Sequence, residues 1–355
     1  MTDIKCDTRW QFRAVSLMNL TKDAIGNTPR DEIGGNFTAN LKKAIGYAVE
    51  VGANYVECAF SFGAKPTREE LLPYYEVVPR LAREAGLNVY FRFDIPTTAR
   101  NGPDCDFRGR ILNKQGDMEL FGRGVADYFE YLKKFMTGMG QNFLRPGDIF
   151  STWAEGDSSF DRELGWEAGT ARYRQYTEKM GALIRNWLNT EHPGVLYAES
   201  VCGGEGRLRE QFTPDSARHL DIIMWDHYAG VNTGGKTIPE ETVERMTASA
   251  ADTARCIEQY AKALGVRVAL GEWSTHWSIP KSKEVQKQYI EIMTSALDRL
   301  PSRYFPGMMY FHFAHPGQSI DYDKAKTYFA AFVADKNGPY PGLYALKEAY
   351  GRHTG

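Results

Sequence analysis

Residues 55–94 read YVECAFSFGAKPTREELLPYYEVVPRLAREAGLNVYFRFD, and the fold can be worked out from this stretch. An apolar run, Tyr55–Phe60, is followed by an amphipathic segment over Thr67–Gly86 and by a second apolar run, Val89–Asp94. Thr67 and Glu70 have the spacing of a capping box that starts a helix, and the glycine at the end of the segment is typical of a helix end. The stretch therefore predicts a strand, a helix and a second strand of a parallel sheet.

The same alternation recurs along the whole chain. Strands are expected at Phe12–Met18, Tyr55–Phe60, Val89–Asp94, Asp148–Trp153, Val195–Ala198, Leu220–Trp225, Val266–Leu270 and Met308–Phe311. Helices are expected over residues 40–52, 67–86, 116–138, 166–189, 239–264 and 283–300. Eight strands with helical connections close a (β/α)8 barrel, and we expect residues 1–355 to form one such catalytic domain. An open doubly wound sheet is the alternative, but no glycine-rich phosphate motif follows the first strand.

Composition excludes several functional classes. Hydrophobic residues make up 43% of the chain and charged residues 25%, and the formal net charge is -2. This balance gives no field that would attract nucleic acid or an anionic membrane surface. The five cysteines show no CxxC spacing, so neither a zinc site nor a disulfide framework is expected. We expect a soluble protein that needs no metal or other cofactor, either cytoplasmic or secreted with its signal removed.

Polar side chains stand near the carboxyl end of most predicted strands, where a barrel of this kind has its active site. We expect Arg13 or Arg92 to neutralise some of the carboxylates among them. The residues at these positions are Glu57, Asp94, Glu155, Glu199, Asp226, His227, Tyr228, Glu272 and His312.

Two of these glutamates stand in distinctive segments. Glu155 ends Phe-Ser-Thr-Trp-Ala-Glu after the fourth strand, and Glu272 stands in Val-Ala-Leu-Gly-Glu-Trp-Ser-Thr after the seventh. The glycine before Glu272 allows another group to approach the backbone closely. A lone charge that closes a buried apolar run is costly unless it is paired or used, so we interpret Glu272 as functional. Glu155 either caps a loop or is a second functional carboxyl group.

These segments resemble the retaining glycoside hydrolases of clan A, which include the family 5 cellulases and mannanases. The resemblance implies that Glu155 is the acid/base and Glu272 the nucleophile, and that the Tyr228 hydroxyl supports Glu272. The clan usually carries asparagine before its acid/base, where this chain has Ala154. Another side chain would then contact the sugar 2-hydroxyl that this asparagine normally binds.

Retaining cleavage of a glycosidic bond needs one anionic and one protonated carboxyl about 5–5.5 Å apart. We expect Trp153 to help desolvate Glu155. The resemblance implies that the substrate is a β-linked oligo- or polysaccharide. Aromatic side chains that can stack on sugar rings gather near the predicted mouth, which agrees with a sugar substrate. The predicted substrate-binding residues are Trp153, His227, Tyr228, Trp273, Trp277 and Phe311.

Two other functions remain open at this point. One is a metal-dependent sugar isomerase-like barrel, for which the ligands would be Glu57, Glu155, Glu199, Asp226 and His227. The other is a catalytically silent barrel that binds glycans, which Ala154 would favour.

Overall fold

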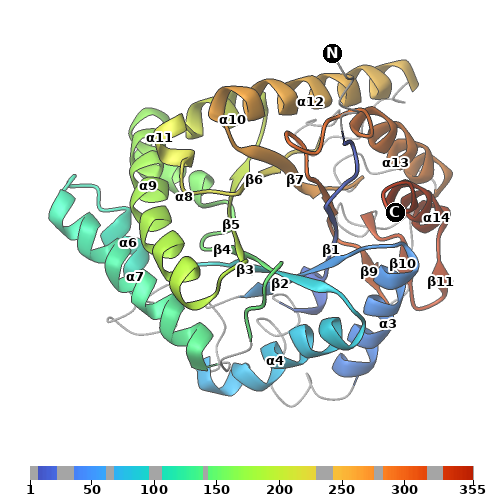
Figure 1. The fold of residues 1–355 in the computed structure, drawn as a ribbon, viewed down its shortest axis with the longest axis horizontal. Coiled ribbons are helices and arrows are strands. Elements are labelled where there is room, and N and C mark those ends of the chain that lie inside the picture. The colour runs from blue at the N-terminus through green and yellow to red at the C-terminus, as the bar shows by residue number, and fades with distance from the viewer. Residues whose placement is uncertain are drawn as a thin grey trace.

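The computed structural model describes residues 7–21, 36–60, 68–95, 106–138, 143–228, 243–275, 283–317 and 331–354. Its centre is a closed barrel of parallel strands in the order β1 to β8, and Figure 1 shows this ring surrounded by helices. The strands are β1 (Phe12–Ser16), β2 (Tyr55–Phe60), β3 (Asn88–Phe93), β4 (Ile149–Ser151), β5 (Leu196–Cys202), β6 (Ile222–Asp226), β7 (Arg267–Trp273) and β8 (Gly307–Tyr310).

The first and last strands close the ring. Phe12 of β1 aligns with Gly307 of β8, and Val15 aligns with Tyr310. Each of the other strands pairs in parallel with its neighbour in sequence. The predicted (β/α)8 barrel is thus confirmed, and the alternative of an open doubly wound sheet is wrong.

The barrel is covered by long helices that alternate with its strands. They are α3 (Phe37–Glu50), α4 (Arg68–Glu84), α7 (Met118–Gly138), α9 (Trp166–Glu191), α12 (Val243–Leu264), α13 (Lys283–Leu297) and α14 (Pro341–Gly351). Shorter elements are η1 (Met18–Leu20), α6 (Phe107–Ile111), α8 (Gly156–Leu164), α10 (Glu205–Gln211) and α11 (Pro214–Ala217). A small second sheet follows β8 and contains β9 (Ala314–His315), β10 (Ala334–Asp335) and β11 (Gly338–Pro339). None of the helices within the described ranges combines the length and the apolar character needed to cross a membrane.

Side chains alternate between two cores, as expected for strands that are buried on both faces. One core fills the barrel, and the other lies between the strands and the helices. The buried members of the inner core are Phe12, Ala14, Tyr55, Tyr90, Ile149, Ala198, Ile222, Met224, Ala269, Met309 and Phe311. On several strands, the residue two positions after an inner-core residue is polar. These polar residues form the site described below.

β4 ends at Ser151 instead of Trp153, because the chain turns after Thr152 and enters α8. The predicted capping box begins at Thr67, which lies outside the described residues. Cys58 and Cys256 are buried, as expected from their positions in a strand and a helix.

The opposite end of the barrel has its own buried ion pair. Asp148, just before β4, is fully buried and accepts a hydrogen bond from Nη1 of Arg83 at 2.7 Å. Its carboxylate also accepts the backbone N–H groups of Val89 and Arg145. This carboxylate fixes the start of β4 against β3 and α4, far along the strands from the polar residues that follow the inner core.

Candidate active site

The site begins where the inner core changes from apolar to polar side chains. Ser16, Glu57, Arg92 and Asp226 each stand two residues beyond an inner-core residue on β1, β2, β3 and β6. Because side chains on a strand alternate between its faces, these four groups point into the barrel at its C-terminal end. All four are buried.

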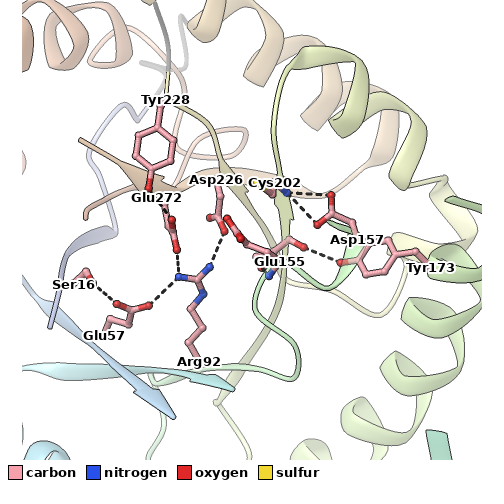
Figure 2. A network of polar contacts seen from close by, with 11 residues as sticks. Ser16, Glu57, Arg92, Glu155, Asp157, Tyr173, Cys202, Asp226, Tyr228 and Glu272 are labelled. Carbon is pink, nitrogen blue, oxygen red and sulfur yellow. Dashed lines mark hydrogen bonds and ion pairs between the residues drawn. The ribbon is translucent and has the colours of Figure 1, made fainter. Parts of the chain in front are cut away.

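Arg92 is the centre of the polar network in Figure 2. Its Nη1 lies 3.2 Å from Oε1 of Glu57 and also contacts Glu272, and its Nη2 lies 2.8 Å from Oδ2 of Asp226. Ser16 donates a hydrogen bond to the other oxygen of Glu57. Burial raises the pKa of Glu57, while Arg92 and Ser16 oppose that rise. One guanidinium therefore serves three carboxyl groups.

Arg13, the other arginine considered as a partner for these acids, lies elsewhere. Its guanidinium donates to the backbone carbonyls of Trp10, Gly52 and His353. Arg13 has the opposite parity to Ala14 and Phe12, whose side chains fill the barrel, and so it belongs to the outer face of β1. The expectation that Arg13 pairs with the acids at the mouth is therefore wrong.

Glu272 reaches the site through an irregularity in β7. The register of β7 with its neighbours shifts between Leu270 and Trp273, so Glu272 aligns with Asp226 of β6. A Cβ on Gly271 would overlap the side chains of Asp226 and Met224, which is why glycine is required before this glutamate. The Tyr228 hydroxyl donates to Oε2 of Glu272 at 2.7 Å. Both oxygens of Glu272 thus accept hydrogen bonds, one from Arg92 and one from Tyr228.

Glu155 approaches from the opposite side of the barrel. It is the N-cap of α8 and has left-handed backbone angles, with φ 48° and ψ 38°. Its backbone N–H donates to Oγ of Ser200 at 2.7 Å, which ties the turn to β5. Burial raises the pKa of the Glu155 carboxyl, and the nearby Glu272 carboxylate raises it further. This environment favours a protonated Glu155.

Three carboxyl groups converge at this point. Glu155, Asp226 and Glu272 each have one oxygen in a set whose members all lie within 4.8 Å of one another. Such a cluster could hold a cation, but Arg92 already makes ion pairs with Asp226 and Glu272 and supplies positive charge there. The carboxyl cluster is consequently built around a guanidinium.

The aromatic residues predicted to bind sugar fall into different places. Phe311 belongs to the inner core and lies edge-on to Tyr228, with ring centroids 6.4 Å apart. His227 stacks on Trp225, with centroids 4.1 Å apart, and its Nδ1 lies 3.2 Å from the Gly203 carbonyl oxygen. Tyr228 and Phe311 therefore lie at the carboxyl cluster, whereas the His227 ring is held against β6.

Trp153 and Trp273 differ from the expectation that they contact substrate. Trp153 is 2% exposed and packs against Phe160 and Tyr176, under the turn that carries Glu155. Trp273 is fully buried and stacks on Tyr289 of α13. The shift in β7 that turns Glu272 inward also turns Trp273 outward. Trp277 lies outside the described residues.

Glu199 also lies away from the mouth, contrary to the expectation from its place in β5. Its neighbours of the same parity, Tyr197 and Val201, belong to the core between strands and helices. Glu199 accepts hydrogen bonds from Tyr197 and Thr152, and burial raises its pKa to about 7. The set of metal ligands considered from the sequence is accordingly not assembled, because neither Glu199 nor the His227 ring joins the cluster.

Sequence reasoning missed three supporting residues. Ser16 orients Glu57, Ser200 holds the turn at Glu155, and the Cys202 thiol is hydrogen-bonded to the Glu155 carboxyl. The period-two pattern could have identified Ser16 and Ser200, because each follows an inner-core alanine by two residues.

His312, expected at the mouth, is buried and has φ 54°, and burial lowers its pKa to about 4. Asp94 follows β3 and is partly exposed.

Comparison with known proteins relates this fold to carbohydrate-active enzymes. No family model and no curated protein matches the sequence. Among solved structures, ZgEngAGH5_4 in complex with a cellotriose is similar, with a TM-score of 0.63 and 14% identity over 96% of this chain and 95% of that one. A structure of two fungal β-1,4-galactanases is similar with a TM-score of 0.62 and 13% identity, over 97% of this chain and 99% of that one.

A family 5 glycoside hydrolase mannosidase from Rhizomucor miehei is also similar, with a TM-score of 0.56 and 10% identity over 99% of this chain and 94% of that one. These similarities extend over nearly the whole of each chain. This chain therefore shares the (β/α)8 barrel fold of these enzymes.

Proposed function

We propose that this protein is a retaining glycoside hydrolase that cleaves β-glycosidic bonds in an oligo- or polysaccharide. The observation that carries the proposal is the approach of Glu155 to Glu272, with one oxygen of each within 4.8 Å. Carboxyl groups about 5–5.5 Å apart are typical of retaining enzymes, whereas inverting enzymes keep them about 6.5–9.5 Å apart to admit a water molecule. The structural neighbours include a mannosidase and galactanases, which supports the same class of reaction.

In the first step of this mechanism, Glu272 attacks the anomeric carbon and Glu155 gives its proton to the glycosidic oxygen. The leaving group departs as an alcohol, and the sugar remains bound as an ester of Glu272. In the second step, Glu155 takes a proton from water as the water oxygen attacks the same carbon. Glu272 is then released as a carboxylate, and the configuration of the sugar is retained.

The two glutamates have environments suited to different roles. Glu272 accepts hydrogen bonds from Arg92 and Tyr228, which hold the carboxylate in place for attack. Glu155 is tied through its backbone and has a raised pKa because it is buried and lies near Glu272. A mechanism with one nucleophile and one acid needs this difference between its two carboxyl groups.

The proposal is tested by replacing each glutamate and assaying aryl β-glycosides together with unactivated β-glycans. Glu272→Ala should abolish hydrolysis of both, because no ester can form. Glu155→Ala should lower the rate on unactivated glycans about 10²–10⁴-fold. It should affect a dinitrophenyl glycoside less, because that leaving group departs without a proton.

Azide distinguishes the two roles further, because it attacks the ester without needing a base. In Glu155→Ala, azide should accelerate breakdown of the glycosyl ester and yield the β-glycosyl azide. Glu130→Ala, at an exposed position on α7, is the control and should match the unsubstituted protein. An α-glycosyl azide from Glu155→Ala, or substantial activity in Glu272→Ala, would show that the assignment is wrong.

A further inference from the structure

Asp226 is a third carboxyl group in this site, and the two-glutamate mechanism does not use it. We propose that Asp226 is a positioning residue whose anionic carboxylate keeps Glu155 protonated until the leaving group takes the proton. This inference rests on the proposed function for its catalytic consequence. The interaction between Asp226 and Glu155 stands on geometry alone.

One oxygen of Asp226 lies within 4.8 Å of one oxygen of each glutamate. Asp226 is 1% exposed, and its Oδ2 receives Nη2 of Arg92 at 2.8 Å. Oδ1 has no hydrogen-bond partner among the described residues. Gly271 leaves room for this oxygen, because a Cβ at that position would overlap it. Figure 2 shows the Asp226 carboxyl group next to both Arg92 and Glu155.

Charge explains why the proton would reside on Glu155. Two carboxylates at this separation in a buried site strongly disfavour ionisation of both. Burial, Glu272 and Glu155 raise the pKa of Asp226, but its direct ion pair with Arg92 opposes that rise and stabilises the anion. Glu155 makes no such ion pair among the described residues and is held by the neutral Cys202 thiol and its own backbone N–H. The other titratable groups that face Asp226 are Glu57, Tyr90, Asp157, Tyr173, Cys202, Tyr228 and Glu272.

The anion at Asp226 would assist both steps of the reaction. Before glycosylation, its charge keeps the proton on Glu155 at a pH where an isolated glutamate would have lost it. After the proton has gone to the leaving oxygen, Glu155 and Asp226 are both anionic. Glu155 is then a stronger base toward the incoming water. Asp226 itself gains and loses no proton in this cycle.

The catalytic test is the pH dependence of kcat/KM for a phenyl β-glycoside, whose leaving group needs a proton. Asp226→Asn keeps the shape of the side chain and removes its charge. The basic limb of the profile should therefore move to lower pH by about 1–3 pH units. Asp226→Glu, which restores the charge, should return the limb toward that of the unsubstituted protein.

Asp148→Asn is the matched control, because it removes another buried, arginine-paired aspartate at the other end of the barrel. It should lower Tm and leave the basic limb in place. A basic limb that stays in place in Asp226→Asn, or that moves equally in Asp148→Asn, would overturn the proposal.

A second measurement does not depend on activity. Carboxyl ¹³C NMR of labelled protein, with the Glu155 signal assigned from its loss in Glu155→Gln, follows the titration directly. In the unsubstituted protein the signals of Glu155 and Asp226 should titrate in two linked steps. Asp226→Asn should move the Glu155 midpoint down by the same amount as the basic limb.

Independent single-step curves in the unsubstituted protein would overturn the inference even if Asp226→Asn failed to fold. Linked titration in a protein that hydrolyses no glycoside would support the interaction and refute the proposed function. The two proposals can thus fail separately.

Discussion

Arg92 shows how one residue determines the geometry of this site. Its guanidinium makes ion pairs with Glu57, Asp226 and Glu272, and all four groups are buried. Removing one member of a buried ion-paired group costs about 3–5 kcal/mol, because the remaining charges lose their partner. The planar fork of arginine can contact several carboxylates at once, which the single ammonium of lysine cannot reproduce. Arg92 therefore fixes where Glu272 lies relative to Asp226.

Tyr228 supplies the other hydrogen bond to Glu272, and its loss can be measured separately. Tyr228→Phe removes the 2.7 Å contact and keeps the ring beside Phe311. A hydrogen bond to a charged group contributes about 1.5–3 kcal/mol, so kcat/KM should fall about 10- to 150-fold.

Tyr55→Phe is the control for this change, because it removes a similar hydrogen bond from Tyr55 to the Gly147 carbonyl at the start of the strands. It should lower Tm without changing kcat/KM. Equal activity losses in both variants would mean that Tyr228 acts through stability instead of through Glu272.

Among the elements, the end of β4 positions Glu155, the proposed acid. After Thr152 the chain passes over the buried Trp153, turns at Glu155 with positive φ and enters α8. A left-handed backbone is rare for glutamate, and it persists here because the surrounding contacts fix the turn. Behind the turn, the Glu199 carboxyl group of β5 accepts hydrogen bonds from the hydroxyl groups of Thr152 and Tyr197.

Glu199 gives the fold a specific pH dependence. Its pKa rises from an ordinary 4.5 to about 7 because it is buried, so the folded state holds a proton that the unfolded state has lost. The free energy of unfolding therefore declines as pH rises from about 4.5 to 7, by roughly 3 kcal/mol from this group. Glu199→Gln should remove that part of the decline. Chemical denaturation between pH 4.5 and 8 measures it.

The exposed Glu130→Gln on α7 controls for the loss of one carboxylate, and its stability curve should run parallel to that of the unsubstituted protein. The free energy of unfolding of Glu199→Gln should be close to that of the unsubstituted protein at low pH. Above pH 7 it should be higher relative to the unsubstituted protein than it is at low pH. Parallel curves for both variants would contradict the buried, protonated Glu199.

The elements also show why sequence predicts some side-chain directions and not others. The alternation in β5 puts Ala198 and Ser200 inside and Glu199 outside, a pattern that period two already contains. In β7 the alternation fails. A regular strand would turn Gly271 and Trp273 inward with Ala269 and would turn Glu272 outward. The register shift reverses the direction at Glu272, and it depends on contacts with Asp226 that no local pattern reveals.

For the whole molecule, the sequence was sufficient to predict the barrel. Eight apolar runs separated by helical segments leave few ways to bury both faces of every strand, and a closed parallel barrel is one of them. The functional positions at the carboxyl ends of β4 and β7 followed from that topology. The cluster of Arg92 with three carboxyl groups did not, because it depends on how residues up to 180 positions apart meet across the barrel.

The proposed mechanism requires that this barrel form a covalent glycosyl ester on Glu272. It is tested most directly by incubating the protein with 2,4-dinitrophenyl 2-deoxy-2-fluoro-β-glycosides of the gluco, manno and galacto series. The fluorine slows both steps, and the good leaving group lets the first one proceed, so the ester accumulates. Intact-mass and peptide mass spectrometry then locate it. We predict one fluoroglycosyl group per chain on Glu272, formed also by Glu155→Ala and not by Glu272→Gln. Labelling at another carboxyl group in the folded protein, or turnover of β-glycosides with inversion, would contradict the account.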